Sequence, residues 1–266
     1  MNLTDRGIGN SSSRSSPIEM VTLITGKVAS GKSTAILKIA DMLGRKRCAG
    51  LLAQEILSDG ERVGFETGAI HNGDRIVLAH KETDKTYQVE DYGVDIPSFE
   101  QLCRKELEAA LLNDEISFIL IDEIGRMQMM SKTFNILLNR MADSYKPLIA
   151  SICYDNDVEQ IAEFKRRNDV VLYTLDENNR DELPLRIVED LCKEDPVYME
   201  KLNLAKIYRS QPERYAYEKD KIVLHSTHGI RTITRDEIYH CDCDYYKENG
   251  VCSHILSLLL PENGKE

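Results

Sequence analysis

The sequence predicts an α/β fold in which an open, mostly parallel sheet carries helices on both faces and a small ββα module follows at the C-terminus. Three observations support this prediction. Short apolar runs alternate with segments of helical periodicity from residue 21 to about residue 192. A glycine-rich turn joins the first run to the first helix. Beyond residue 220, two segments of alternating polarity precede a cluster of cysteines and a histidine.

Five apolar runs are expected to form the parallel strands, because each is short, rich in β-branched residues and followed by a helical pattern. They cover residues 21–25, 48–54, 117–123, 148–152 and 170–174. The more polar segment after residue 58, together with residues 75–80, indicates antiparallel hairpins inserted beside this sheet. Ser98 and Gln101 are interpreted as a capping box that begins a helix, and Ser131 as the start of another.

The composition and charge exclude several classes of protein. The chain has 266 residues, of which 42% are hydrophobic, and a net charge of −11, so it does not resemble a nonspecific nucleic-acid binder. It contains no apolar run of membrane-spanning length and no apolar signal-peptide core. We therefore expect a cytoplasmic protein with no membrane association. The seven cysteines are then expected to be reduced or metal-bound, with Cys48, Cys103, Cys153 and Cys192 as buried core residues.

Three regions are predicted along the chain. Residues 1–17 are rich in serine and are expected to be a disordered tail. Residues 18–195 contain the alternating strands and helices. Residues 196–266 are expected to form a second, smaller domain that contains the cysteine and histidine cluster.

The glycine-rich turn fits the phosphate-binding pattern G-x-x-x-x-G-K-[ST] without a mismatch. Its residues are Gly26, Lys27, Val28, Ala29, Ser30, Gly31, Lys32, Ser33 and Thr34. In such a loop, backbone N–H groups surround a phosphate, the helix N-terminus faces the same oxygens and the lysine adds a positive charge. We expect Lys32 to contact the phosphates and Ser33 to hold Mg²⁺.

A pair of carboxylates ends the third apolar run. Asp122 is expected at the carboxyl end of its strand, where it can hold Mg²⁺ opposite the loop. Glu123 follows directly and is placed to accept a proton from a water molecule that attacks the γ-phosphate. This pair favours hydrolysis over transfer to a second substrate.

With these motifs in place, residues 21–192 resemble the small P-loop nucleoside-triphosphatases, also called the cancer-related nucleoside-triphosphatase family. The resemblance includes the loop, residues 92–95, residues 121–134 and residues 174–181. It implies slow, Mg²⁺-dependent hydrolysis of nucleoside triphosphates such as ATP or GTP. It also implies that Arg126 lies near the phosphates and that Asn179 and Arg180 lie near the base. Arg62, in the predicted hairpin insert, is a weaker candidate for a residue that contacts the nucleotide.

The C-terminal cluster has the ligand set of a structural zinc site. Cys241 and Cys243 follow a predicted hairpin, and Cys252 and His254 begin an apolar helix. Three thiolates and one imidazole satisfy the tetrahedral coordination of Zn²⁺. The order C-x-C then C-x-H resembles the SWIM zinc finger, which implies a partner that is DNA, RNA or a protein.

Two other functions remain open at this stage. The chain could be a small kinase that phosphorylates a nucleoside or a nucleic-acid end, with the hairpin insert as a lid over the acceptor. It could also be a nucleotide-gated adaptor with negligible turnover, in which the zinc finger carries the function.

Overall fold

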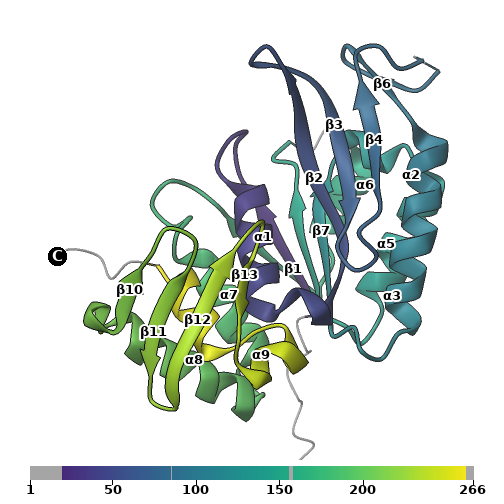
Figure 1. Ribbon diagram of the computed structural model, residues 1–266. Helices are drawn as coiled ribbons and strands as arrows, with labels where there is room; N and C mark the ends of the chain where they lie inside the picture. Colours follow the sequence, from purple (N-terminus) through teal and green to yellow (C-terminus); the bar gives the residue numbers. More distant parts are fainter. Residues whose placement is uncertain (1–19, 85, 156–157, 262–266) are drawn as a thin grey trace, which may run out of the picture.

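The computed structural model describes residues 20–84, 86–155 and 158–261 (Figure 1). The main sheet has nine strands in the order β5-β6-β4-β3-β2-β7-β8-β1-β9, and a second sheet has the order β10-β11-β12-β13. None of the helices in these ranges combines the length and apolarity needed to cross a lipid bilayer. The predicted tail at residues 1–17 lies outside the described residues.

The five predicted parallel strands are confirmed, and they lie side by side in one half of the main sheet. They are β1 (Val21–Thr25), β2 (Cys48–Ser58), β7 (Phe118–Ile124), β8 (Leu148–Ile152) and β9 (Val170–Thr174). Strand β1, which leads into the phosphate-binding loop, is parallel to β8 on one side and to β9 on the other. The loop therefore follows a strand that has a parallel neighbour on each side, one strand in from the β9 edge of the sheet.

The other half of the sheet is antiparallel, so the sheet is mixed rather than mostly parallel. Its strands are β3 (Glu61–Ala69), β4 (Arg75–His80), β5 (Gln88–Val89) and β6 (Tyr92–Val94). Strand β2 is longer than predicted and reaches a turn at Asp59 and Gly60, from which β3 returns antiparallel. The predicted hairpins are thus confirmed, and they continue the sheet instead of lying apart from it (Figure 1).

Helices cover both faces of the sheet, as predicted, because neighbouring strand residues point to opposite sides. In β1, Leu23 packs in one core cluster and Ile24 in another. The Leu23 cluster contains α2 (Ile96–Cys103), α5 (Lys132–Ala142) and α6 (Glu159–Lys165), and the Ile24 cluster contains α1 (Lys32–Leu43) and α7 (Leu183–Cys192). The remaining short helices of this part are η1 (Arg45–Arg47), η2 (Arg104–Glu108), α3 (Ala109–Leu112) and α4 (Arg126–Met129).

One predicted helix start is correct and the other is wrong. Ser131 caps α5, and its hydroxyl accepts a hydrogen bond from the Phe134 N–H at 3.0 Å. Helix α2 instead begins one turn before the predicted capping box, because Asp95 accepts the Ser98 N–H at 3.0 Å. A proline at the start of the helix is compatible with this position, since its missing N–H would have no partner within the helix.

The C-terminal part is larger than the predicted ββα module. It contains α8 (Pro196–Arg209), η3 (Pro212–Arg214), β10 (Tyr215–Tyr217), β11 (Ile222–Ser226), β12 (Gly229–Arg235), β13 (Tyr239–Cys241), α9 (Asp244–Asn249) and α10 (Ser253–Leu259). The two predicted strands are β11 and β12. Helices α8 and α10 pack against α1, so the small sheet and the main sheet share a continuous layer of helices (Figure 1).

Candidate nucleotide site

The phosphate-binding loop has the backbone that its glycines allow. Gly31 has φ = 100°, in the left-handed region that side chains disfavour, and it caps the N-terminus of α1. At Gly26, an added Cβ would lie 2.5 Å from the Leu175 carbonyl oxygen, so only glycine fits against the segment after β9. The Lys32 ammonium donates hydrogen bonds to the carbonyls of Gly26 at 2.9 Å and Lys27 at 3.1 Å. These bonds fix the lysine side chain against the first residues of the loop.

The Ser30 hydroxyl is a buried polar atom in the same loop, and it has no hydrogen-bond partner among the described residues. A buried, unsatisfied hydroxyl costs free energy in a folded protein. Its presence in a loop that is built to surround an anion fits a phosphate oxygen as the missing partner.

A bulge at the end of β7 gives the two carboxylates different surroundings. Ile121 pairs with Ala150 of β8 but Ile124 pairs with Ile152, so β7 contains one extra residue at Asp122 and Glu123. Asp122 is 3% exposed and accepts a hydrogen bond from the Ser151 hydroxyl. Glu123 is half-buried and lines the cavity above the loop.

Both carboxylates have raised pKa values. Burial raises the pKa of Asp122, against the opposing effects of the Ser151 and Ser33 hydroxyls and of Lys32. Burial, followed by the charge of Asp122, raises the pKa of Glu123, and Lys32 lowers it. A carboxylate with a raised pKa is a stronger proton acceptor, which is what general-base chemistry requires.

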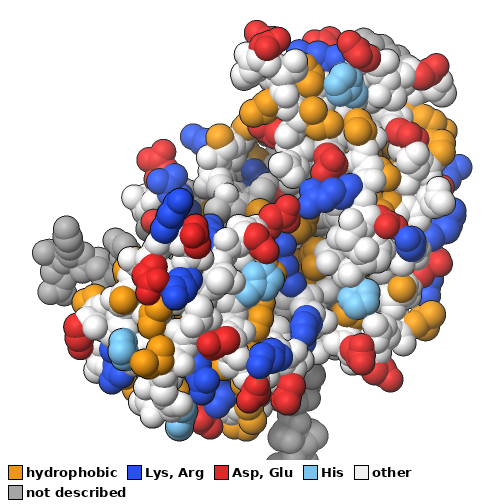
Figure 2. Space-filling view, viewed as in Figure 1, with side chains coloured by type: hydrophobic (Ala, Val, Ile, Leu, Met, Phe, Trp, Pro, Cys, Tyr) orange, Lys and Arg blue, Asp and Glu red, His pale blue; other side chains and the backbone are white. Residues whose placement is uncertain are grey.

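These residues border one cavity of about 820 Å³ between the loop before α1 and the β2–β3 hairpin. Figure 2 shows the surface hollowed in this region. The predicted site residues that line the cavity are Gly26, Val28, Ala29, Gly31, Lys32, Ser33, Thr34, Glu123 and Arg126. The volume is in the range of small-molecule binding sites.

Other predicted residues lie outside the lining. Asp122, Lys27 and Ser30 are not among the residues that line the cavity. Asn179 braces the segment after β9, since its amide donates to the Thr174 carbonyl at 2.8 Å and accepts from the Asp176 N–H at 3.0 Å. Neither Asn179 nor Arg180 lines the cavity, and their contact with the base stays a prediction.

The structure adds residues that the sequence reasoning did not assign to the site. Phe65, Val89 and Tyr92 line the cavity from the hairpin insert, beside Arg62. Cys153 also lines it and is half-buried rather than a buried core residue as predicted. The sequence signals for the insert were the polar segment that follows the turn at residues 58–60, together with residues 75–80. They indicate hairpin strands and do not show which side chains face a cavity.

The donor set at the phosphate loop fits Mg²⁺. This ion prefers hard oxygen ligands and keeps part of its water shell. The Ser33 hydroxyl is close enough to lower the pKa of the Asp122 carboxyl, so two oxygen ligands of this kind lie near each other. Ser33 is exposed at the start of α1, where it can also face a phosphate oxygen.

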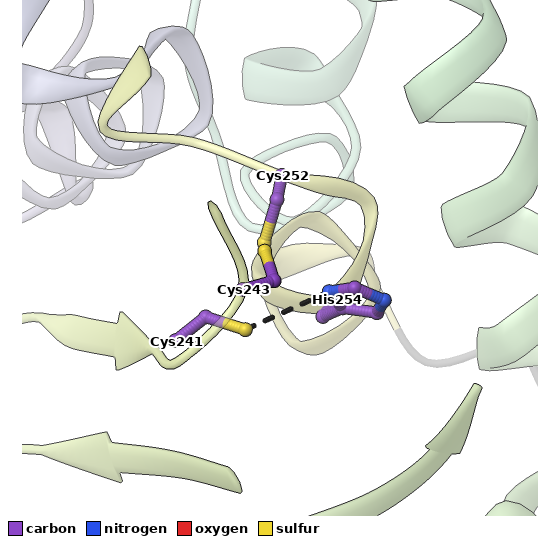
Figure 3. A group of neighbouring side chains, drawn as sticks. All are labelled: Cys241, Cys243, Cys252 and His254. Atoms are coloured by element: carbon purple, nitrogen blue, oxygen red, sulfur yellow. Dashed lines mark hydrogen bonds between the residues drawn. The ribbon is translucent and has the colours of Figure 1, made fainter. Parts of the chain in front are cut away.

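The second cluster lies in the C-terminal part (Figure 3). The ligand atoms of Cys241, Cys243, Cys252 and His254 all lie within 4.8 Å of one another, and all four residues are buried. The Cys241 Sγ is 3.6 Å from the His254 Nδ1. Hydrogen bonding from Cys241 lowers the pKa of Cys243, which favours a thiolate. The chemistry and closure of this set fit a structural Zn²⁺ ion.

Comparisons with known proteins match the part of the chain that contains the nucleotide site. The family model described as NTPase matches residues 21–188. Nucleoside-triphosphatase THEP1 from Thermotoga sp. (strain RQ2) is 36% identical over 166 residues, which are 62% of this chain and 91% of that protein. Nucleoside-triphosphatase THEP1 from Methanothermobacter thermautotrophicus is 32% identical over 172 residues, 64% of this chain and 95% of that protein.

Two solved structures have the same fold. The crystal structure of THEP1 from Aquifex aeolicus has a TM-score of 0.57 and 31% identity, covering 63% of this chain and 96% of that one. The solution structure of a human cancer-related nucleoside triphosphatase has a TM-score of 0.55 and 25% identity, covering 65% and 97% respectively. Residues 189–266 lie beyond the region that the family model matches. Because the family model covers more than half of the chain, the chain belongs to the NTPase family.

Proposed function

We propose that the chain hydrolyses nucleoside 5'-triphosphates to the diphosphate and phosphate in a Mg²⁺-dependent reaction. The names of its relatives support this activity. The observation that carries the proposal is the shared cavity, in which Lys32 of the phosphate loop, Glu123 and Arg126 face one space. Phosphate binding, charge neutralisation and a proton acceptor are the parts that this hydrolysis needs.

In the proposed mechanism the loop amides and Lys32 hold the β- and γ-phosphates. Ser33 and Asp122 would hold Mg²⁺, which neutralises phosphate charge when bound. Glu123 accepts a proton from water as the water oxygen attacks the γ-phosphorus. The bond from the γ-phosphorus to the bridging oxygen breaks, and the diphosphate leaves with the electron pair. Arg126 offsets the negative charge that develops on the γ-phosphate.

The segment after β9 is our candidate for the base-binding side. Leu175 packs against Gly26 of the phosphate loop, which brings this segment next to the bound nucleotide. Asn179 fixes the shape of the segment, and the exposed Arg180 guanidinium could stack on a base. Contacts of this kind accept several bases, so hydrolysis of ATP and GTP alike is expected.

For the C-terminal part we propose a SWIM-type zinc finger that binds DNA, RNA or a protein partner. From residue 197 onward the chain has ten Lys and Arg against eleven Asp and Glu residues. Figure 2 shows both signs of charge intermingled over the visible face of β10 to β13. Nucleic-acid binding needs concentrated positive charge. The nearly equal numbers of positive and negative residues therefore do not favour DNA or RNA over a protein as the partner.

The hydrolysis proposal is tested by phosphate release from ATP, GTP, CTP and UTP with Mg²⁺. We expect Glu123→Gln to bind nucleotide but to lower turnover at least a hundredfold, because general bases contribute roughly that much. The matched control is Glu200→Gln, an exposed carboxylate on α8, which should keep wild-type turnover. Unchanged turnover in Glu123→Gln would remove the role proposed for this residue.

A further inference from the structure

The hairpin side of the cavity has a preformed aromatic surface. The Phe65 and Tyr92 rings meet edge to face, with centroids 5.3 Å apart. The Arg62 guanidinium lies 5.0 Å from the Phe65 centroid. Its Nε donates to the Tyr92 hydroxyl at 3.4 Å, and its Nη1 donates to Glu55 at 2.8 Å. These contacts hold a ring and a guanidinium plane in place, and both surfaces stack well on planar rings. We call Arg62, Phe65 and Tyr92 the hairpin wall.

The sheet order puts the hairpin wall on the Glu123 side of the phosphate loop. Strand β7, which carries Glu123, lies between β2 and β8, and β1 follows β8. The segment after β9 lies on the other side of β1. If the base of the triphosphate lies at that segment, as in the proposed function, the wall lies beyond the γ-phosphate and is left for a second molecule.

The charges on this side favour an uncharged ligand. Among the described lining residues of the insert, Glu55 and Glu90 are negative and Arg62 alone is positive, and Arg62 is already paired with Glu55. A phosphate group would find no unpaired cation there. Gln54 and Glu90 instead offer acceptors for the N–H and O–H groups of a heterocycle and a sugar. Stacking on one face with acceptors at the rim is chemistry that suits a nucleoside.

We propose that the hairpin wall is a second subsite that binds a nucleoside, and that the bound nucleoside can replace water as the phosphoryl acceptor. A nucleoside hydroxyl oxygen attacks the γ-phosphorus and forms the new P–O bond. The bond from the γ-phosphorus to the bridging oxygen breaks, the diphosphate leaves with the electron pair, and Glu123 takes the hydroxyl proton. The products are a nucleoside monophosphate and a nucleoside diphosphate. This inference rests on the proposed function for the position of the triphosphate.

The test uses the full chain with Mg²⁺ and ATP labelled with ¹⁸O in the γ-phosphoryl group. Adenosine, guanosine, cytidine, uridine and thymidine are each added in excess, and products are separated by mass spectrometry. We expect labelled nucleoside monophosphate to appear with at least one nucleoside, while release of inorganic phosphate falls. Phosphate release without any labelled monophosphate would overturn the inference and leave the proposed function standing. Formation of neither product would overturn both.

Variants locate the subsite. Phe65→Leu and Arg62→Met should each lower the ratio of transfer to hydrolysis roughly tenfold, because a lost stacking surface weakens base binding by that order. Arg62 is exposed, so its substitution does not disturb the core. The matched control is Tyr87→Leu, an exposed aromatic residue of the same insert outside the cavity lining, which should keep the ratio. If both wall variants instead raise the KM for ATP and keep the ratio, the wall holds the base of the triphosphate and the inference is wrong.

Discussion

Glu106 shows how one side chain can hold three segments of the chain together. It lies in η2 and is 2% exposed. Its carboxylate accepts backbone N–H groups from Gly50 at 2.9 Å, His71 at 2.8 Å and Asn72 at 3.3 Å. Gly50 belongs to β2, and the other two residues form the turn between β3 and β4. The Glu106 carboxylate therefore helps to attach the base of the hairpin insert to η2, where Lys105 also forms an ion pair with Asp74.

We expect Glu106→Gln to lower the free energy of unfolding by about 2 kcal/mol, because a charged acceptor of several N–H groups is replaced by an amide that also carries donors. Urea denaturation measures the change. Glu108→Gln is the control, since Glu108 lies two residues away and its ion pair within the described part of the chain is a 3.9 Å contact with Arg140. That variant should stay within about 0.5 kcal/mol of the wild type. Equal losses in both variants would contradict the role of Glu106.

The sequence indicates the candidate site residues that depend on short-range patterns, and it does not indicate those that depend on long-range strand pairing. The phosphate loop follows β1, and Asp122 and Glu123 lie near the end of β7, so a local motif locates each of them. The hairpin wall forms only because β3 and β6 each pair with β4, which brings Phe65 beside Tyr92. Glu106 was missed for a related reason, since a glutamate in a helical segment is normally exposed.

At the scale of elements, an ion-pair network connects α5 to β9. Arg167 contacts Asp169 through two hydrogen bonds of 2.9 Å and 2.7 Å, and it reaches Asp143, at the end of α5, at 2.7 Å. The hydrogen bonds from Arg167 lower the pKa of Asp169. Such a lowered pKa in the folded state stabilises the protein above the unfolded pKa, and the stability is lost as pH falls through the folded value.

We therefore expect Asp169→Asn to be less stable than the wild type by about 1 kcal/mol at pH 6. The difference should shrink as the pH falls below about 3.8, because the unfolded chain then binds a proton at Asp169 that the folded chain, with its lowered pKa, does not yet bind. It should disappear once Asp169 is protonated in the folded state as well. Urea titrations at several pH values measure this. Asp59→Asn, in the exposed turn between β2 and β3, is the control and should show no such dependence. A difference that stays constant across the pH range would contradict the ion-pair explanation.

Element boundaries beyond residue 195 were the least predictable. Helix α8 was not predicted, although the sequence has signals for it. Asp195 and Pro196 form a typical helix start, and Tyr198, Leu202 and Ala205 recur at helical spacing and are buried. The polar residues Glu200, Lys201 and Asn203 between them obscure the apolar face. Which face of α8 is buried becomes clear only from the packing of this helix against α1 and α10.

For the whole molecule, α1 connects the two candidate sites. Its first residues are Lys32 and Ser33 of the phosphate loop. Its apolar face shares a core with Val251 and Leu256, which flank the ligands Cys252 and His254. The Tyr198 hydroxyl also donates to the Met42 carbonyl near the C-terminal end of α1, at 2.9 Å. The core that contains α1 thus includes residues that neighbour the Cys/His cluster.

We expect zinc removal to destabilise the nucleotide domain as well as the C-terminal part. A structural zinc ion contributes free energy to folding, and the shared core transmits its loss to α1. Calorimetry with and without a chelator should show one cooperative transition that moves to lower temperature, and elemental analysis should show about one zinc ion per chain. Nucleotide affinity should fall in parallel, because Lys32 and Ser33 begin α1.

Cys252→Ser should reproduce the effect of the chelator, since it removes one of the four ligands. Cys153→Ser is the matched control, because Cys153 lies outside the cluster and the variant should keep its zinc and its transition temperature. Two separate transitions, of which only one responds to the chelator, would show that the C-terminal part folds independently of α1. In that case the metal cluster could act on the nucleotide site only through a bound partner.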